Sequence, residues 1–254
     1  MDSRYIVITP YFKEEEEVLS RCIESVRNQT IKTDHFLVAD GFPQDWIDQM
    51  KGSIRHLVLD KPYADFGNTP RGIGAQLAIS DKYDGICFLD ADNWIDENHV
   101  EACLESARNG YGRVDDCDYV VARRRLVRPD GSTLPIPEEN HHVDTSCFFL
   151  LPGAYFIAPY WNLMPREVAP LCDRIFFENI RGLALRVAEN KTETVNYLSM
   201  WESHYRLLNE EPPANAKPNI DGARVVHWMN SLRGRERVVF DRLIGRDKRL
   251  MLHE

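Results

Sequence analysis

The feature that most constrains the fold is an alternation of short apolar runs with helix-like segments through the first half of this 254-residue chain. The apolar runs, in which β-branched residues are common, are residues 5–9, 35–39, 54–59 and 85–89. The expected helices are residues 14–28, a short piece around Trp46, 71–82 and 97–108. Short buried strands that alternate with helices are typical of a parallel sheet covered on both faces. The sequence therefore predicts an α/β fold with a mostly parallel, doubly wound sheet.

Polar and acidic residues lie at the carboxyl ends of the four apolar runs. Thr9 ends the first run, which should stop there because Pro10 has no N–H to donate. Asp40, Asp60 and Asp90 directly follow the other three. Because doubly wound sheets bind ligands at the carboxyl ends of their strands, we expect these residues at one ligand-binding edge. A row of carboxylates needs compensating cations or hydrogen bonds, which suggests a polar ligand and a metal ion.

Composition and charge exclude several classes of protein. The 40 Asp and Glu residues outnumber the 31 Lys and Arg residues. A general nucleic-acid binder is therefore not expected, because such proteins bind phosphates mainly through basic side chains. The six cysteines form no CxxC pair and should be reduced thiols. The N-terminal region lacks the apolar core of a signal peptide, and the apolar residues 147–159 are too short to span a bilayer. We expect a cytoplasmic protein with at most peripheral membrane contact.

After residue 112 the regular alternation fades. Asp130-Gly131 is a turn signal between two strand-like runs, which predicts an antiparallel extension of the sheet. Helices are expected at residues 176–187 and 231–252, and residues 224–228 have the pattern of a strand.

Asp90 and Asp92 form a D-x-D directly after the fourth apolar run. Residues two apart in an extended chain point the same way, and hard divalent cations prefer carboxylate oxygens as ligands. In the alternative interpretation, Asp90 caps the strand and Asp92 caps the next helix, which is a common use of Asp. The D-x-D alone leaves both interpretations open.

Four short motifs follow one another in a recognisable order. They are Thr-Pro-Tyr at 9–11, Ala-Asp-Gly at 39–41, Asn-Thr-Pro-Arg-Gly-Ile-Gly at 68–74 and Phe-Leu-Asp-Ala-Asp-Asn-Trp at 88–94. In this order and spacing the chain resembles the GT-A glycosyltransferases, in particular the inverting family 2 enzymes that use nucleotide sugars. The resemblance implies a GT-A fold and the transfer of a sugar from a nucleoside-diphosphate sugar to an acceptor hydroxyl.

The resemblance implies roles for residues on the donor side. Thr9, Pro10 and Tyr11 match the family's first-strand edge, which lies against the nucleotide. Asp40 matches the acid that usually hydrogen-bonds the base, and Arg71 matches a basic or polar side chain near the base or ribose. These five residues are therefore the expected nucleotide-binding residues.

The same resemblance implies two roles within the D-x-D. Asp90 matches the acid that contacts the ribose or sugar, and Asp92 matches the acid that coordinates Mg²⁺ or Mn²⁺ on the diphosphate. Some GT-A enzymes also bring a late histidine to the metal, and His227 is the candidate here. The alternative for His227 is a half-buried histidine without such a role. The expected cofactor is thus Mn²⁺ or Mg²⁺, held by Asp92 and His227.

Family 2 enzymes also place an acid before a helix in their acceptor half. Asp173 matches that acid and is the candidate general base, although the residue before it is Cys172 where the family has an acid. Asp173 could instead cap the helix that begins at Arg174. Asp144 is the rival base, and it could alternatively line the acceptor pocket.

The resemblance divides the chain by function within one continuous GT-A domain. Residues 1–112 are expected to bind the nucleotide sugar, and residues 113–254 to bind the acceptor and to end in a helical segment. The acceptor is expected to be a carbohydrate or a lipid-linked acceptor, as in the assembly of surface polysaccharide or lipopolysaccharide. Two clusters of basic residues, at 224–249 and 123–128, could bind a diphosphate or an anionic acceptor at a membrane.

Two other classes of function stay open on the sequence. An apolar strand followed by D-x-D also opens the nucleophile motif of haloacid dehalogenase phosphatases, but Trp94 stands where that family has Thr or Val. The second alternative is a non-catalytic module that binds a nucleotide or carbohydrate, because a fold does not fix a function.

Overall fold

The computed structural model describes residues 3–50, 54–136 and 143–243 of the chain. Its strands are β1 (Tyr5–Tyr11), β2 (Thr33–Ala39), β3 (Ile54–Val58), β4 (Gly85–Phe88), β5 (Trp94–Ile95), β6 (Tyr119–Val127), β7 (Thr133–Leu134), β8 (Phe148–Leu150) and β9 (Val187–Leu198). Its α-helices are α1 (Glu16–Arg27), α2 (Asp45–Asp48), α3 (Asn68–Ser80), α4 (His99–Tyr111), α5 (Tyr160–Leu163), α6 (Cys172–Arg181), α7 (Glu202–Leu207), α8 (Gly222–Ser231) and α9 (Gly234–Leu243).

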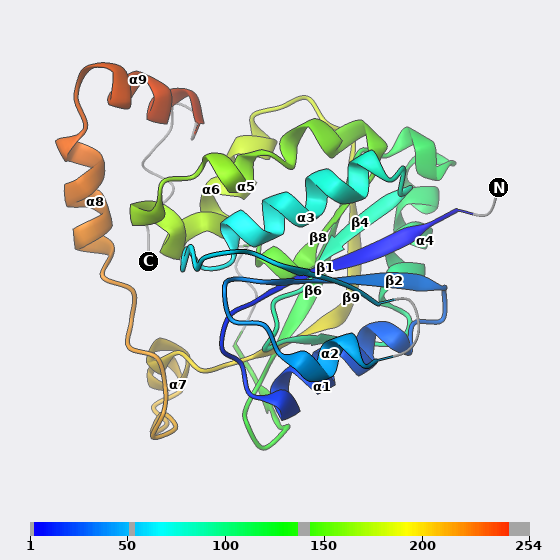
Figure 1. The fold of residues 1–254 in the computed structure, drawn as a ribbon, viewed down its shortest axis with the longest axis horizontal. Coiled ribbons are helices and arrows are strands. Elements are labelled where there is room, and N and C mark those ends of the chain that lie inside the picture. The colour runs from blue at the N-terminus through cyan, green and yellow to red at the C-terminus, as the bar shows by residue number, and fades with distance from the viewer. Residues whose placement is uncertain (1–2, 51–53, 137–142, 244–254) are drawn as a thin grey trace.

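These strands form one mixed sheet in the order β3-β2-β1-β4-β8-β6-β9-β5, and β7 pairs with β6 outside this path. Helices lie on both sides of the sheet, while α8 and α9 project away from it (Figure 1). The predicted α/β class with a mostly parallel sheet is confirmed.

The first half of the sheet is parallel throughout. β1 pairs with β2 on one side and with β4 on the other, and β3 pairs with the outer side of β2. Because these strands share one direction, their carboxyl ends lie at one edge of the sheet. Asp40, Asp60 and Asp90, which follow β2, β3 and β4, are therefore brought to that edge as predicted.

β1 continues past Pro10 to Tyr11, so the expected stop at Pro10 is wrong. The N–H of Leu89 donates to Ile8 O at 3.0 Å, which shows that the polar groups of Ile8 face β4. Pro10, two residues on, faces the same way, where β4 has already ended beside Ile8. The missing N–H of Pro10 therefore costs the sheet no ladder hydrogen bond.

Different helices cover the two faces of β1. Gly74 of α3 lies so close to β1 that a Cβ there would come within 2.7 Å of Ile8 Cγ2. Thr9 points to the opposite face, where its Oγ1 lies 3.7 Å from Cys22 Sγ on α1. Because both faces are buried, the strand is apolar almost without interruption, which made it visible in the sequence.

The second half of the sheet is partly antiparallel. β8 runs antiparallel to both β4 and β6, and β7 forms a hairpin with β6 around Asp130-Gly131, as predicted. β9 differs from the expectation, because it pairs with β6 in parallel. The chain makes this possible by crossing through α5 and α6 between β8 and β9, so that β9 enters the sheet in the same direction as β6.

The C-terminal elements correct three sequence expectations. The helix expected at 176–187 is α6, which begins at Cys172 and ends at Arg181. Residues 224–228 are helical, within α8, rather than a strand. The buried residues of α8 are Val225 and Met229, four apart, which is the spacing of one helix face. The helix expected at 231–252 is α9, which begins only at Gly234, because α8 ends at Ser231. The part of the expected helix beyond residue 243 lies outside the described residues.

All six cysteines are buried, as expected of structural thiols. Across the described ranges, no helix combines the length and the apolar composition that a bilayer crossing requires.

Candidate active site

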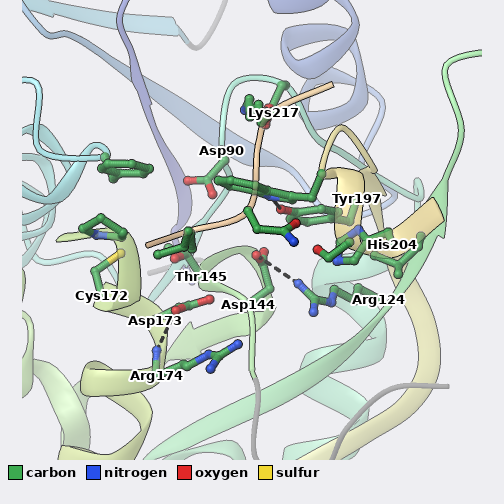
Figure 2. Close-up of a pocket in the computed structure, with 18 of the residues that line it drawn as sticks. Asp90, Arg124, Asp144, Thr145, Cys172, Asp173, Arg174, Tyr197, His204 and Lys217 are labelled. Carbon is green, nitrogen blue, oxygen red and sulfur yellow. Dashed lines mark hydrogen bonds and ion pairs between the residues drawn. The ribbon is translucent and has the colours of Figure 1, made fainter. Parts of the chain in front are cut away.

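A cavity of about 620 Å³ opens where the carboxyl edge of the parallel strands meets the second half of the chain. Asp90 and Asp92, after β4, line it together with Asp144 and with Asp173 of α6. Figure 2 shows Asp90, Asp144 and Asp173 around this cavity. The structure thus joins both candidate bases and the D-x-D in one site. The other lining residues are Phe66, Arg71, Arg124, Leu126, Ile136, Thr145, Ala169, Pro170, Cys172, Arg174, Tyr197, Trp201, Ser203, His204, Arg206, Leu207, Lys217, Asn219 and Ile220.

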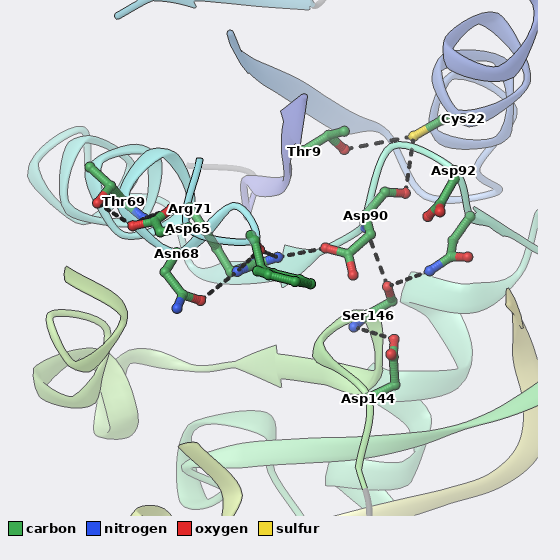
Figure 3. Close-up of polar contacts among 12 residues, drawn as sticks. Thr9, Cys22, Asp65, Asn68, Thr69, Arg71, Asp90, Asp92, Asp144 and Ser146 are labelled. Atoms are coloured by element: carbon green, nitrogen blue, oxygen red, sulfur yellow. Dashed lines mark hydrogen bonds and ion pairs between the residues drawn. The ribbon is translucent and has the colours of Figure 1, made fainter. Parts of the chain in front are cut away.

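Asp90 is held by an arginine from inside the protein. Arg71 Nη2 donates to Asp90 Oδ1 at 2.6 Å, and the arginine side chain is only 1% exposed. Arg71 also donates to Asn68 Oδ1 at 3.2 Å (Figure 3). Its guanidinium lies over the ring of Trp161, 4.9 Å from the centroid. The expected nucleotide residue Arg71 therefore reaches the site, where it compensates the charge of Asp90.

Asp92 carries a different cation. Lys217 Nζ lies 3.4 Å from Asp92 Oδ2, and both side chains remain partly exposed. Burial raises the pKa of the Asp92 carboxyl, Lys217 acts against this rise, and the negative charge of Asp90 adds to it. Each acid of the D-x-D therefore has its own counter-ion.

Asp144 is a buried acid bound on both carboxylate oxygens. Arg124 Nη1 of β6 lies 3.2 Å from its Oδ2, and the N–H of Ser146 donates to its Oδ1 at 2.9 Å. Burial raises the pKa of Asp144, the Arg124 guanidinium opposes the rise, and the charges of Asp90 and Asp173 strengthen it. Asp144 is thus tied to the protein rather than directed at a substrate.

Ser146 connects Asp144 to the D-x-D loop. Its Oγ accepts from Asp90 N and from Asn93 Nδ2, each at 3.3 Å (Figure 3). Asn93 Oδ1 in turn accepts from Leu198 N at the end of β9, at 3.0 Å. These hydrogen bonds fix the D-x-D loop against the second half of the sheet.

Asp173 reaches the cavity from the first turn of α6. Its Oδ1 accepts from Arg174 N at 2.7 Å. The helix begins at Cys172 with Leu171 at its N-cap, so the alternative in which Asp173 caps a helix that begins at Arg174 is wrong. Further along α6, Phe176 stacks on Trp161 with ring centroids 4.0 Å apart and an interplanar angle of 9°. The buried aromatic stack fixes the helix, and the helix directs Asp173 into the cavity.

The expected first-strand residues do not line the cavity. Thr9 Oγ1 lies 2.8 Å from His35 Nε2 inside the core, and Tyr11 OH lies 2.7 Å from His56 Nε2. Pro10 is buried between them. Asp40 accepts from the backbone N–H groups of residues 63 and 64, at 2.7 and 2.8 Å. In this structure Asp40 holds a loop, and its expected contact with a base stays a prediction.

His227 is not brought to the D-x-D. Its side chain is exposed on α8 and does not line the cavity.

The sequence pattern also missed four cavity residues of the second half. They are Arg124, Tyr197, His204 and Lys217. Of these, only Arg124 stood out in the sequence, as part of the basic cluster at 123–128.

The match to known proteins decides the family. Residues 6–156, more than half of the chain, match the family model described as glycosyl transferase family 2. The chain belongs to this family. The protein is therefore a glycosyltransferase, and the phosphatase and non-catalytic alternatives are set aside.

Solved structures give the same fold for this glycosyltransferase. The crystal structure of S. aureus TarS 1–349 matches with a TM-score of 0.57 at 13% identity, covering 95% of this chain and 69% of that one. Its complex with UDP gives 0.58 at 12% identity, covering 95% and 69%. The complex with UDP-GlcNAc gives 0.54 at 11% identity, covering 95% and 70%. None of the curated proteins compared with the chain matches it significantly.

The glycosyltransferase offers oxygen ligands that fit a divalent ion carried by a diphosphate. Among the described residues, no three His, Cys, Asp or Glu side chains gather into a preformed metal site. Mg²⁺ is commonly held by one or two carboxylates together with substrate phosphates. Asp92, with Asp90 beside it at the cavity, fits that kind of site. His227 does not contribute to it.

Proposed function

We propose that this family 2 glycosyltransferase moves a sugar from a nucleoside-diphosphate sugar to an acceptor hydroxyl, with inversion at the anomeric carbon. The observation that carries the proposal is that the D-x-D of the first half and Asp173 of the second half line one cavity. A donor bound at Asp90 and Asp92 would present its anomeric carbon to an acceptor held beside Asp173. Inversion then follows from a single displacement without a covalent intermediate.

On the donor side, the first half of the chain would bind the nucleotide, with residues 1–112 as the donor half. Arg71 holds the Asp90 carboxylate in place, so that Asp90 can accept hydrogen bonds from ribose or sugar hydroxyls. TarS, which shares the fold, has been crystallised with UDP and with UDP-GlcNAc. This supports a nucleotide-sugar donor. Thr9, Pro10, Tyr11 and Asp40 would serve this half by shaping the strand ends and loop around the nucleotide.

We assign the general base to Asp173 rather than to Asp144. A general base has to accept the proton of the attacking hydroxyl within hydrogen-bond reach. Both oxygens of Asp144 are engaged by Arg124 and Ser146, and its side chain is only 6% exposed. Asp173 is half-buried at the cavity and lies closer to solvent than Asp144. Asp144 would then act as a structural acid that keeps Arg124 and the D-x-D loop in place.

We further propose that Mn²⁺ or Mg²⁺ binds with the donor at Asp92. When bound there, a divalent ion would neutralise the charge that develops on the leaving diphosphate. Asp92 supplies the carboxylate, and Asp90 completes the negative charge that attracts the cation. Burial already penalises the negative charge of Asp92, which favours binding of a positive partner.

On the acceptor side, aromatic faces suit a carbohydrate. Trp201 donates from Nε1 to Tyr197 OH at 2.8 Å, and both rings line the cavity. Aromatic rings with a polar handle pack well against sugar rings. Residues 113–254 would thus bind a carbohydrate or a lipid-linked acceptor, as in surface polysaccharide or lipopolysaccharide assembly. Peripheral contact with the inner face of a membrane, through the basic residues after Arg224, would bring the enzyme to a lipid-linked acceptor.

The assignment of Asp173 is tested with Asp173→Asn, which keeps the shape and removes the base. We expect the rates of sugar transfer and of slow donor hydrolysis to fall by at least about 100-fold. Affinity for the nucleoside diphosphate should not change, because Asp173 belongs to the acceptor side. Asp115→Asn is the matched control, since Asp115 is exposed beside Arg113 and does not line the cavity. A near-normal rate in Asp173→Asn would contradict the assignment.

A further inference from the structure

Lys217 is fixed at the cavity by its backbone. The N–H of Glu202 donates to Lys217 O at 3.0 Å, and the N–H of Lys217 donates to Met200 O. These bonds attach Lys217 to the start of α7, although the chain around it, residues 209–219, is largely exposed. The ammonium group lies 5.7 Å from the centroid of the Trp201 ring and 3.4 Å from Asp92 Oδ2. Figure 2 shows Lys217 at the cavity. A strand-like bridge thus holds this cation beside the D-x-D.

The position of the ammonium group conflicts with a divalent ion on the same carboxylate. Lys217 Nζ is 3.4 Å from Asp92 Oδ2, whereas Mg²⁺ binds carboxylate oxygen at about 2.0–2.1 Å. Two cations on one carboxylate would repel each other strongly in a partly buried site. A divalent ion at Asp92 therefore requires the ammonium group to move away from the carboxylate.

A displaced Lys217 would have one favourable new partner. Its backbone bonds keep Lys217 at the rim of the cavity, and its side chain is 52% exposed, so an ammonium group that leaves Asp92 enters water beside the cavity. A diphosphate on the same edge carries several negative oxygens, and lysine binds phosphate as a mobile point charge. Without a diphosphate, the freed ammonium group would lose its anionic partner to the divalent ion.

We propose that Lys217 is an internal counter-ion of Asp92 that a divalent ion displaces only together with a diphosphate, onto which the ammonium group then moves. The proposal rests on the proposed function, because it assumes a nucleoside-diphosphate donor at this edge. It assigns Lys217 two linked roles, a competitor for the free metal ion and a ligand for the donor diphosphate. Metal ion and donor therefore bind as a pair, and the metal ion alone binds weakly.

Lys217→Met separates the two roles, because it keeps the length of the side chain and removes its charge. Mn²⁺ alone, followed by its electron paramagnetic resonance signal, should bind the variant about threefold more tightly, because the variant has no ion pair at Asp92 for the metal ion to break. Diphosphate binding with Mn²⁺, measured by calorimetry with UDP, GDP and dTDP, should weaken at least about threefold for the nucleotide that binds the unchanged enzyme. A folding defect would not move the two affinities in opposite directions.

Two further variants complete the test. Lys217→Arg keeps the charge and should bind Mn²⁺ as the unchanged enzyme does. Lys191→Met removes an exposed lysine of β9 that does not line the cavity, and should change neither affinity. The proposal is overturned if Lys217→Met leaves Mn²⁺ affinity unchanged, or if diphosphate affinity fails to fall. If the unchanged enzyme binds none of the three nucleotides, the proposed donor site fails instead, and the Mn²⁺ comparison still tests the competition.

Discussion

The indole of Trp161 lies parallel to the ring of Phe176, with centroids 4.0 Å apart. The same indole contacts the guanidinium of Arg71, which holds Asp90. One fully buried side chain therefore supports both the helix that carries Asp173 and the arginine that fixes the D-x-D.

Replacing this side chain should destabilise the whole protein. We expect Trp161→Ala to lower the free energy of unfolding by about 3–5 kcal/mol, because it leaves a large cavity in the core. Urea denaturation measures this loss. Trp46→Ala is the control, since Trp46 is only half-buried, outside this stack, and should cost less. Equal losses in the free energy of unfolding of the two variants would show that the stack adds nothing to the stability of the protein.

Replacing Asp90 should lower the free energy of unfolding more than replacing its partner Arg71 does. Asp90→Ala leaves the guanidinium of Arg71 without a counter-charge in the interior and should cost about 3 kcal/mol or more. Arg71→Met leaves a carboxylate that is 31% exposed at the cavity, where water can solvate it, so the charge penalty should be smaller. Unfolding in urea at neutral pH compares them. A larger loss in Arg71→Met would contradict this view of the pair.

Substitutions at Asp144 and Asp173 should differ in their effect on the free energy of unfolding. Asp144→Ala removes the carboxylate that pairs with the buried Arg124, and we expect a loss of about 3–5 kcal/mol in the free energy of unfolding. Asp173→Asn should change it by less than about 1 kcal/mol, because Asp173 is half-buried and asparagine can also accept the hydrogen bond from Arg174 N. Thermal unfolding of both variants, beside their rates, identifies the structural acid and the base. A stable Asp144→Ala variant would argue against the structural role of Asp144.

Two buried histidines predict a loss of stability in acid. Burial lowers the pKa of His35 to about 3 and that of His99 to about 4. In the unfolded chain each binds a proton near pH 6.5, so between pH 6.5 and about pH 4 the unfolded state holds more protons. The contribution of each histidine to the free energy of unfolding is therefore full above pH 6.5. It is lost as the pH falls, at a rate that approaches about 1.4 kcal/mol per pH unit for each histidine.

The measurement is urea denaturation at pH 6.5 and pH 5. The two histidines together predict a difference of about 3 kcal/mol, and His35→Gln should remove about half of it. An unchanged pH dependence in His35→Gln would show that His35 is protonated in the folded protein.

Local patterns were sufficient to predict the donor half. β1, β2 and β4 are buried on both faces, so each one is an apolar run that a sequence displays directly. β3, at the edge of the sheet, is only half-buried. Once these strands are parallel, the D-x-D after β4 has to lie at the ligand-binding edge. Asp173 was found through a resemblance, and the structure brings it to the same cavity as Asp90 and Asp92.

The missed features depend on contacts between distant parts of the chain. The run around His227 contains apolar residues that fit both a strand and a helix, and only packing of Val225 and Met229 selects the helix. Thr9 and Tyr11 lie in the last three residues of β1 and point away from the cavity, toward His35 and His56. Lys217 lies in an exposed loop without a motif and meets Asp92 only through the tertiary fold.

The central claim, a nucleoside-diphosphate site at the Asp90–Asp92 edge, is tested most directly by thermal unfolding with UDP, GDP and dTDP, with and without Mn²⁺. A ligand that binds only the folded state at 100 times its dissociation constant stabilises by about 2.7 kcal/mol, a rise of several degrees in Tm. We predict that one diphosphate with Mn²⁺ raises the Tm and that Asp92→Ala abolishes the rise. No rise with any of the three nucleotides would contradict the account.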